Sequence, residues 1–144
     1  MKTFKLDEAR SLLPVVESLL SRALEAKQAA SDLQEQIGDL ARRIFVSGGM
    51  FLDIAAAYKR KITLEALVQR ARDAIQEIDA IGVQIKDLDI GLLDFPFLLE
   101  GETVLLCWKR GEPRIEFWHR IEDGFAGRQP IDGRFGPISP EKLN

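Results

Sequence analysis

The stretch that decides the fold runs from residue 86 to residue 128 and reads KDLDIGLLDFPFLLEGETVLLCWKRGEPRIEFWHRIEDGFAGR. It holds both tryptophans, the single histidine, the single cysteine and four of the eight phenylalanines. Its apolar residues alternate with polar ones or form short runs that end at Gly or Pro, a pattern typical of β-strands. Before Gly82 the apolar residues follow a helical period, so the chain changes from helix to sheet at about this glycine.

Four short segments have strand character, and the second ends at Pro96, which has no amide proton for a sheet. A four-residue hairpin loop, Arg110 to Pro113, separates the last two. This loop length pairs Trp108 with Ile115 and Val104 with His119. The histidine then shares a packed face with Trp108, and Cys107 and Trp118 lie on the opposite face with Glu116. The predicted strands are 83–86, 91–95, 103–109 and 114–118.

The residues before Gly82 predict a long antiparallel pair of helices. A short helix at 7–13 precedes Pro14, which starts the long first helix, and Gly48-Gly49 makes the turn. The second helix starts near Phe51. The first helix carries an unbroken 3-4 apolar spacing typical of a coiled-coil seam: Val16, Leu19, Ala23, Ala26, Ala30, Leu33, Ile37, Leu40 and Ile44. The second carries a seam and a stripe beside it: Leu64, Val68, Ala71, Ile75 and Ile78, then Leu67, Ala74 and Ile81.

These elements predict an α+β fold in which a long antiparallel, coiled-coil-like helical hairpin precedes a small antiparallel sheet of three or four strands. We expect one domain, with the hairpin at 1–82, a β-meander at 83–119 and a Gly/Pro-rich loop and tail at 120–144, its last ten residues partly disordered.

Composition and charge limit the classes of function. The chain has 144 residues, a formal net charge of −3 and one cysteine, so it forms no internal disulfide. No run of about 18 apolar residues occurs, and the first residues lack a signal peptide's apolar stretch, so we expect a cytoplasmic protein without a membrane anchor. The acidic balance disfavours nucleic acid and leaves an RNA-associated role as the third alternative.

Four sequence motifs resemble those of the domain of unknown function 2203 family of small bacterial and archaeal proteins. They are KDLDIGLLDFP, LCWKRGE, FWHR and GFAGRQP, and the start, FKLDEARSLLP, is similar as well. The resemblance spans nearly the whole chain. It implies a helical hairpin joined to a small sheet, and it brings no established activity, cofactor or catalytic residue.

The candidate ligand-binding residues lie where strands end. Asp94 precedes Phe95-Pro96, and His119 ends the last strand before Glu122. Gly124 and Gly127 let backbone amides converge on an anion, and Arg128 can add a bidentate contact. One histidine with carboxylates is a weak metal signature, so we predict no metal site and favour a small anionic ligand.

Each candidate also has a purely structural interpretation. Asp94 can cap a turn, His119 can donate to a carboxylate, and Phe125 can fill the core from its loop. Cys107 is expected to pack in a strand, with Glu116 opposite it raising the thiol pKa. Trp118 with Lys109 and Arg114 can stack nucleic-acid bases or form an ordinary surface.

The leading functional hypothesis is a non-enzymatic interaction or scaffold protein that forms a homodimer through its helices. Two helices about 45 Å long expose more apolar stripe than a four-strand sheet covers, and pairing two hairpins would cover the rest. The alternative is a small enzyme or an anion- or metal-binding protein with its site at the sheet edge. No catalytic residue or cofactor follows from the sequence.

Overall fold

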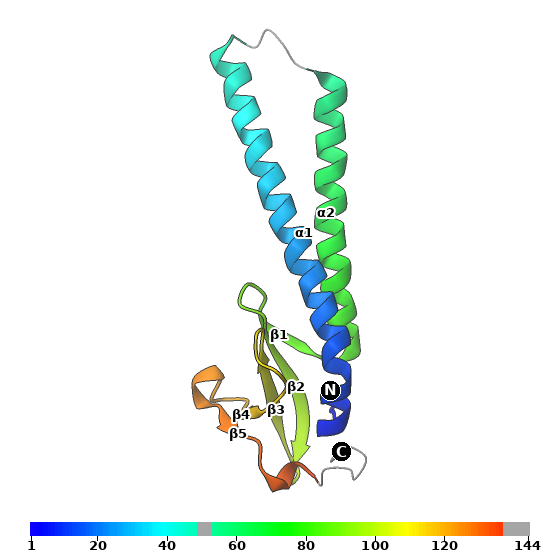
Figure 1. Cartoon of the computed structure of the whole chain (residues 1–144), viewed down its shortest axis with the longest axis vertical. Helices are drawn as coiled ribbons and strands as arrows, with labels where there is room; N and C mark the ends of the chain where they lie inside the picture. Colours follow the sequence, from blue (N-terminus) through cyan, green and yellow to red (C-terminus); the bar gives the residue numbers. More distant parts are fainter. Residues whose placement is uncertain (49–52, 137–144) are drawn as a thin grey trace. The chain divides into compact units, whose positions relative to one another are not determined.

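The computed structural model describes residues 1–48 and 53–136 and has two long helices followed by a five-stranded antiparallel sheet (Figure 1). The α+β prediction is confirmed, with five strands in place of three or four. The helices are α1 (Leu6–Val46) and α2 (Ile54–Ile81), and the strands are β1 (Gln84–Asp87), β2 (Leu92–Leu99), β3 (Glu102–Lys109), β4 (Phe117–Arg120) and β5 (Gln129–Pro130). Two 3-10 turns, η1 (Phe125–Gly127) and η2 (Gly133–Phe135), flank β5.

The chain divides into two compact units, which are described separately below. The sheet unit comprises Met1–Ser18 and Glu77–Asn144, and the hairpin unit comprises Leu19–Gln76. The boundary therefore falls inside both helices and not at Gly82. Our expectations for Gly49 and Phe51, and for the tail from residue 137, lie outside the described residues.

The first helix is continuous, so the predicted break at Pro14 is wrong. Pro14 lies inside α1 and is exposed. A proline removes one helical amide donor, but α1 continues through Pro14, whose side chain is exposed and displaces no packed neighbour. Asp7 and Glu8 in the first turn suit the positive end of the helix dipole, and Glu8 caps the amide of Lys5 at 3.1 Å.

The predicted seam of the first helix is confirmed, with its packing closest in the first half. Val16 to Ala30 are buried at the seam positions, whereas Leu33, Ile37, Leu40 and Ile44 are half-buried.

The seam predicted for the second helix is wrong in part. Ala74 is 1% exposed and Leu67 is half-buried, whereas Val68 is exposed. The seam of α2 therefore steps through Leu64, Leu67, Ala71, Ala74, Ile78 and Ile81. The stripe predicted beside the seam, Leu67, Ala74 and Ile81, is therefore part of the packing within the chain.

The sheet is a meander in the order β1-β2-β3-β4-β5. β2 runs through Pro96, against our prediction that it stops there. The Pro96 carbonyl accepts a hydrogen bond of 2.7 Å from the Phe4 amide, so the amide-free side of the proline faces the edge that β1 leaves uncovered. A proline is tolerated at such an edge position.

The register of β3 with β4 is shifted by one residue from the prediction. Leu106 pairs with Trp118 and Leu105 with His119. The connection from Arg110 to Glu116 is longer than a four-residue loop because Ile115 leaves the strand and is fully buried. A one-residue shift moves every side chain of β4 to the other face. Trp118 is therefore buried, at 1% exposed, and not on the open surface we expected.

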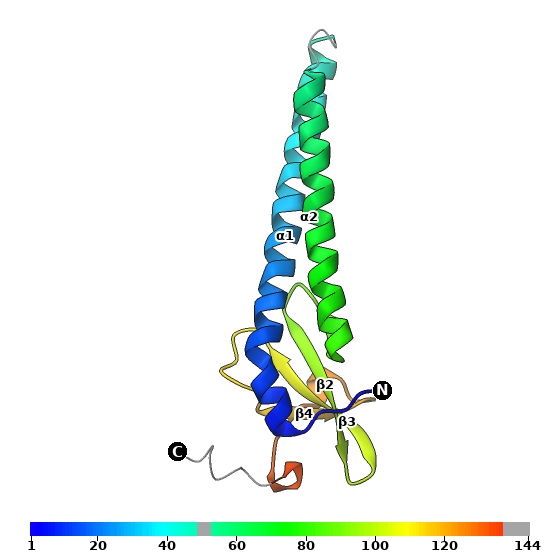
Figure 2. The ribbon, with the colours of Figure 1, turned by 90° about the vertical axis from the view of Figure 1, so that its right-hand side faces the viewer.

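We call the two sides of the sheet the inner face (Leu93, Phe95, Leu106, Trp108, Trp118) and the outer face (Asp94, Leu105, Cys107, Phe117, His119), as the cross-strand register assigns them. The first turns of α1 lie over the inner face (Figure 2). The Phe4 and Phe95 rings meet edge to face at 5.6 Å, and the Arg10 guanidinium donates to the Ile115 carbonyl at 3.0 and 3.1 Å.

The C-terminal segment closes the inner face from a second direction. The Phe135 ring of η2 lies 4.9 Å from Phe97 and 5.4 Å from Trp118. β5, which the sequence did not predict, pairs with β4. Across residues 1–48 and 53–136, no helix combines the length and apolar character needed to cross a membrane.

Candidate functional site

Three polar side chains meet in the buried interior of the outer face. Asp94 of β2, Cys107 of β3 and His119 of β4 are 1%, 0% and 3% exposed. One ligand atom from each, the carboxylate oxygen, Sγ and an imidazole nitrogen, lies within 4.8 Å of the other two. Asp94 and Cys107 are direct cross-strand partners, and His119 is two residues from Phe117, the partner of Cys107 on the other side. The sheet ladder therefore builds this polar cluster.

The hydrogen bonds of His119 define its tautomer. Its Nδ1 lies 2.8 Å from the backbone carbonyl of Arg120, and its Nε2 lies 3.1 Å from Asp94 Oδ1. A carbonyl only accepts, so Nδ1 carries a proton and donates it. In the neutral ring the lone pair is then at Nε2, which faces the carboxylate oxygen of Asp94.

The third member of the cluster is a protonated thiol. Burial, together with the negative charge of Asp94 and a hydrogen bond to that carboxylate, raises the pKa of Cys107 to about 12. The prediction that Glu116 faces this thiol is wrong, since the register places Asp94 and Phe117 beside it. A neutral, buried thiol is a poor nucleophile.

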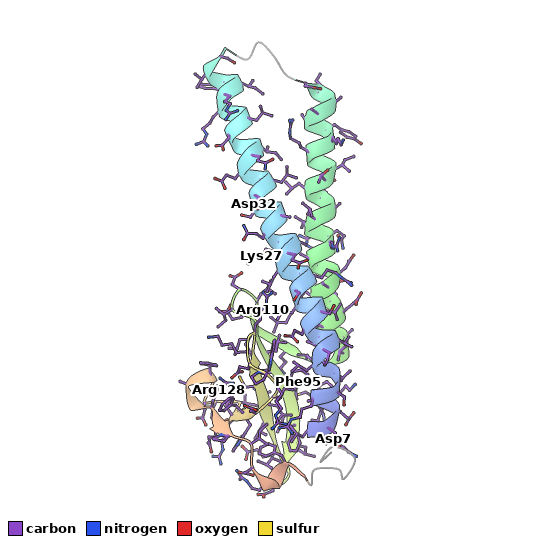
Figure 3. All side chains as sticks on the ribbon, in the orientation of Figure 1. Asp7, Lys27, Asp32, Phe95, Arg110 and Arg128 are labelled. Carbon is purple, nitrogen blue, oxygen red and sulfur yellow. The ribbon has the colours of Figure 1, made fainter. Side chains whose placement is uncertain are left out.

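Arg128 lies over the same outer face but is held by other groups. Figure 3 shows it on the side of the sheet away from α1, with Phe95 on the side toward α1. Its Nη2 donates to both carboxylate oxygens of Glu112 at 2.7 Å, and its guanidinium stacks 4.1 Å from the Phe117 ring and 4.7 Å from the Phe125 ring. Glu112 thus takes the contact that we predicted for an anionic ligand.

The glycine-rich loop is a compact turn and not an open anion cradle. The amide of Gly127 donates to the Gly124 carbonyl at 3.1 Å, and that of Arg128 donates to Phe125 at 3.2 Å. Gly124 has φ +65°, which favours glycine, and a Cβ on Gly127 would meet the Cβ of Asp123 at 2.5 Å. Gly124 is therefore required for its positive φ, and Gly127 for its close approach to the Asp123 side chain.

The six predicted site residues are thus only partly brought together. Asp94 and His119 are in contact, while Glu122 is exposed on the loop. The prediction missed Cys107 and Glu112 as neighbours of this site. The one-residue register error placed the thiol on the opposite face from His119. Glu112 had no signal beyond its place in a predicted turn, where it now also accepts the Lys109 amide at 2.6 Å.

A second feature lies within the hairpin unit. Within this unit, the two helices diverge toward the end of α1 and the start of α2 (Figure 1). There a groove of about 310 Å³ opens between them, almost wholly apolar in lining. Ile37, Leu40, Ala41, Ile44, Ala57 and Leu64 line it, with Arg60 and Lys61 also at its wall.

Comparison with known proteins gives one match. The chain matches the model of the family described as uncharacterized conserved protein DUF2203 over residues 2–131. No curated protein and no solved structure matches it. The matched segment takes in both helices and all five strands of the structure. By this coverage, the chain belongs to the uncharacterized conserved protein family DUF2203.

Proposed function

We propose that this protein is a non-enzymatic interaction protein that forms a homodimer through its helical hairpin. The dimer contact is the turn-proximal half of the hairpin, which is the last part of α1 and the first part of α2. The observation that carries the proposal is the apolar groove of about 310 Å³ between α1 and α2. Apolar clefts of this size are places where another chain or ligand is buried. The half-buried seam residues that line it gain most from being covered.

Several large apolar side chains at the end of α1 and in the first turns of α2 are exposed. Phe45 and Val46, at the end of α1, are 86% and 84% exposed. On α2, Ile54, Tyr58 and Ile62 are exposed at four-residue spacing, so they form one stripe along the helix. Large apolar side chains gathered in this way mark interaction surfaces more often than scattered ones do.

A second copy of the chain is the occupant that fits these features. Each copy offers both a groove and a protruding apolar stripe, which a two-fold axis can match reciprocally. Each also offers exposed carboxylates on α1, such as Asp32 and Glu35, and exposed amines on α2, such as Lys59 and Lys61. Two hairpins would then make a four-helix bundle with coiled-coil packing.

The other hypotheses have less support. Trp118 is buried and so offers no stacking platform for RNA. Arg128, the main cation of the predicted anion site, is paired with Glu112 instead. We place the protein in the cytoplasm, in keeping with its lone, reduced cysteine.

Sedimentation equilibrium tests the dimer directly. At tens of micromolar the wild type should have twice the chain mass, and Tyr58→Glu with Ile62→Glu should give the monomer mass with helical circular dichroism retained. Two carboxylates in an apolar interface are costly to bury, so we expect dimer dissociation to shift by at least about 100-fold.

Ile121→Glu is the matched control. Ile121 is 55% exposed, close to the 46% of Ile62, but it lies in the sheet unit. Its substitution should leave the dimer mass unchanged. A wild type that sediments as a monomer at tens of micromolar would overturn the proposal, as would an equal loss of mass with Ile121→Glu.

A further inference from the structure

The geometry points to a zinc-binding site formed by Asp94, Cys107 and His119. This proposal is independent of the homodimer, because the cluster lies wholly within the sheet unit. Three different donor atoms from three adjacent strands lie within 4.8 Å of one another, with the Nε2 to Oδ1 spacing already at 3.1 Å. Zinc bonds of about 2.0–2.3 Å in a tetrahedron place neighbouring donors roughly 3.3–3.8 Å apart, so spacings of at most 4.8 Å contract by no more than about 1.5 Å on binding.

The second hydrogen bond of His119 prepares the ring for a metal. Histidines that bind metals usually donate their other ring N–H to a carbonyl or carboxylate, which fixes the tautomer and the ring orientation. The Nδ1 proton of His119 is donated to the Arg120 carbonyl at 2.8 Å. The Nε2 lone pair is thereby directed at Asp94, another member of the cluster.

The charge of the cluster also suits a divalent ion. Bound as a thiolate, a carboxylate and a neutral imidazole, the three ligands carry a formal charge of −2. A single Zn²⁺ brings the total charge of ligands and ion to zero. The loaded site therefore buries no net charge where all three side chains are buried, and burying net charge is the largest cost that such a site can face.

The donor set selects the kind of ion. A thiolate and an imidazole disfavour Mg²⁺ and Ca²⁺, which prefer all-oxygen ligands, whereas sulfur, nitrogen and carboxylate oxygen are the ordinary ligands of zinc. Three protein ligands leave the fourth position of a tetrahedral ion to a water molecule.

The full chain, stripped with a chelator and dialysed, provides the test. Addition of Co²⁺ as a spectroscopic substitute should produce a sulfur-to-cobalt charge-transfer band and tetrahedral d–d bands, saturating at one ion per chain. Zn²⁺ should abolish these bands by displacement, and metal analysis of the Zn²⁺-loaded, dialysed protein should give one zinc per chain.

Variants then assign the ligands. Cys107→Ser should remove the charge-transfer band, and His119→Ala and Asp94→Asn should each weaken Zn²⁺ binding by about 100-fold or more, since loss of outer-shell partners alone costs 10–100-fold. Glu122→Gln is the matched control on the neighbouring exposed loop and should change nothing.

The wild-type spectrum decides the proposal even if a variant fails to fold. Absence of the charge-transfer band in the folded wild type would overturn the metal site and leave a hydrogen-bonded polar cluster. Zinc binding that persists at one per chain in a folded Cys107→Ser variant, with unchanged affinity, would do the same.

Discussion

The sheet unit and the turn-proximal half of the hairpin distribute their apolar side chains in opposite ways. In the sheet unit Trp108, Phe95 and Trp118 are at most 1% exposed, although smaller numbers of large apolar side chains, such as Leu98 and Phe125, are exposed there at 57% and 42%. In the hairpin, Phe45, Ile54 and Tyr58 are 86%, 74% and 64% exposed. The sheet encloses its core between strands and the first turns of α1, whereas two helices alone have only one seam to share. The sheet unit therefore buries its largest aromatic side chains within itself, whereas the hairpin leaves large apolar side chains exposed, as an interaction surface does.

The largest test of this contrast compares two Phe→Ala substitutions. Phe95→Ala should lower the free energy of unfolding by about 3–5 kcal/mol, because it empties a buried ring site that contacts Phe4. Phe45→Ala should change it by less than about 0.5 kcal/mol, because the ring is already in water. Urea unfolding at concentrations low enough to dissociate any dimer measures both. Similar losses from the two variants would contradict the contrast.

The same contrast explains what the sequence could predict. The 3-4 spacing from Val16 to Ile44 is a local pattern, and it gave the helical hairpin without knowledge of any distant contact. The least certain part of the helix prediction was the choice between Val68 and Leu67 for the seam of α2. Both lie on a broad apolar arc, and only packing against α1 decides between them.

The candidate site depended on a non-local quantity, the register of β4 against β3. The segment RGEPRIEF allows a four-residue loop, and nothing in it signals that Ile115 leaves the strand or that Arg10, about a hundred residues earlier, donates to its carbonyl. One residue of shift moved His119 onto the face with Cys107. The sequence therefore identified most of the residues of the site, but not that Cys107 lies beside Asp94 and His119.

An ion-pair comparison gives a smaller effect. Arg128→Ala should cost about 2 kcal/mol, because the guanidinium is largely buried, paired with Glu112 and stacked on two rings. A double-mutant cycle with Glu112→Ala should give a coupling energy of about 1 kcal/mol or more. In the hairpin, Asp39 and Arg42 are an exposed pair one helical turn apart, and the same cycle there should give less than about 0.5 kcal/mol. Equal couplings would mean that the outer-face pair is solvated like the hairpin pair.

The smallest effect is a pH dependence confined to the sheet unit, measured on metal-free protein. Burial and Asp94 raise the pKa of Cys107 from 9.0 to about 12 in the folded chain. Below about pH 8 the thiol is protonated in both states and changes nothing. Above pH 9 the unfolded chain releases this proton while the folded chain keeps it, so the free energy of unfolding falls as pH rises toward 12. Between pH 9 and pH 10 the loss should be about 1 kcal/mol.

Lysines and the tyrosine titrate in the same range, so the Cys107→Ala variant is the reference that isolates the thiol. Urea unfolding of both proteins at pH 8, 9 and 10 should show the wild type losing about 1 kcal/mol more than the variant between pH 9 and pH 10. Equal slopes would show that the thiol ionises as readily in the folded chain as in the unfolded one. The outer face would then be open to solvent at Cys107, and the difference between an enclosed sheet unit and an exposed hairpin would fail at its most buried polar site.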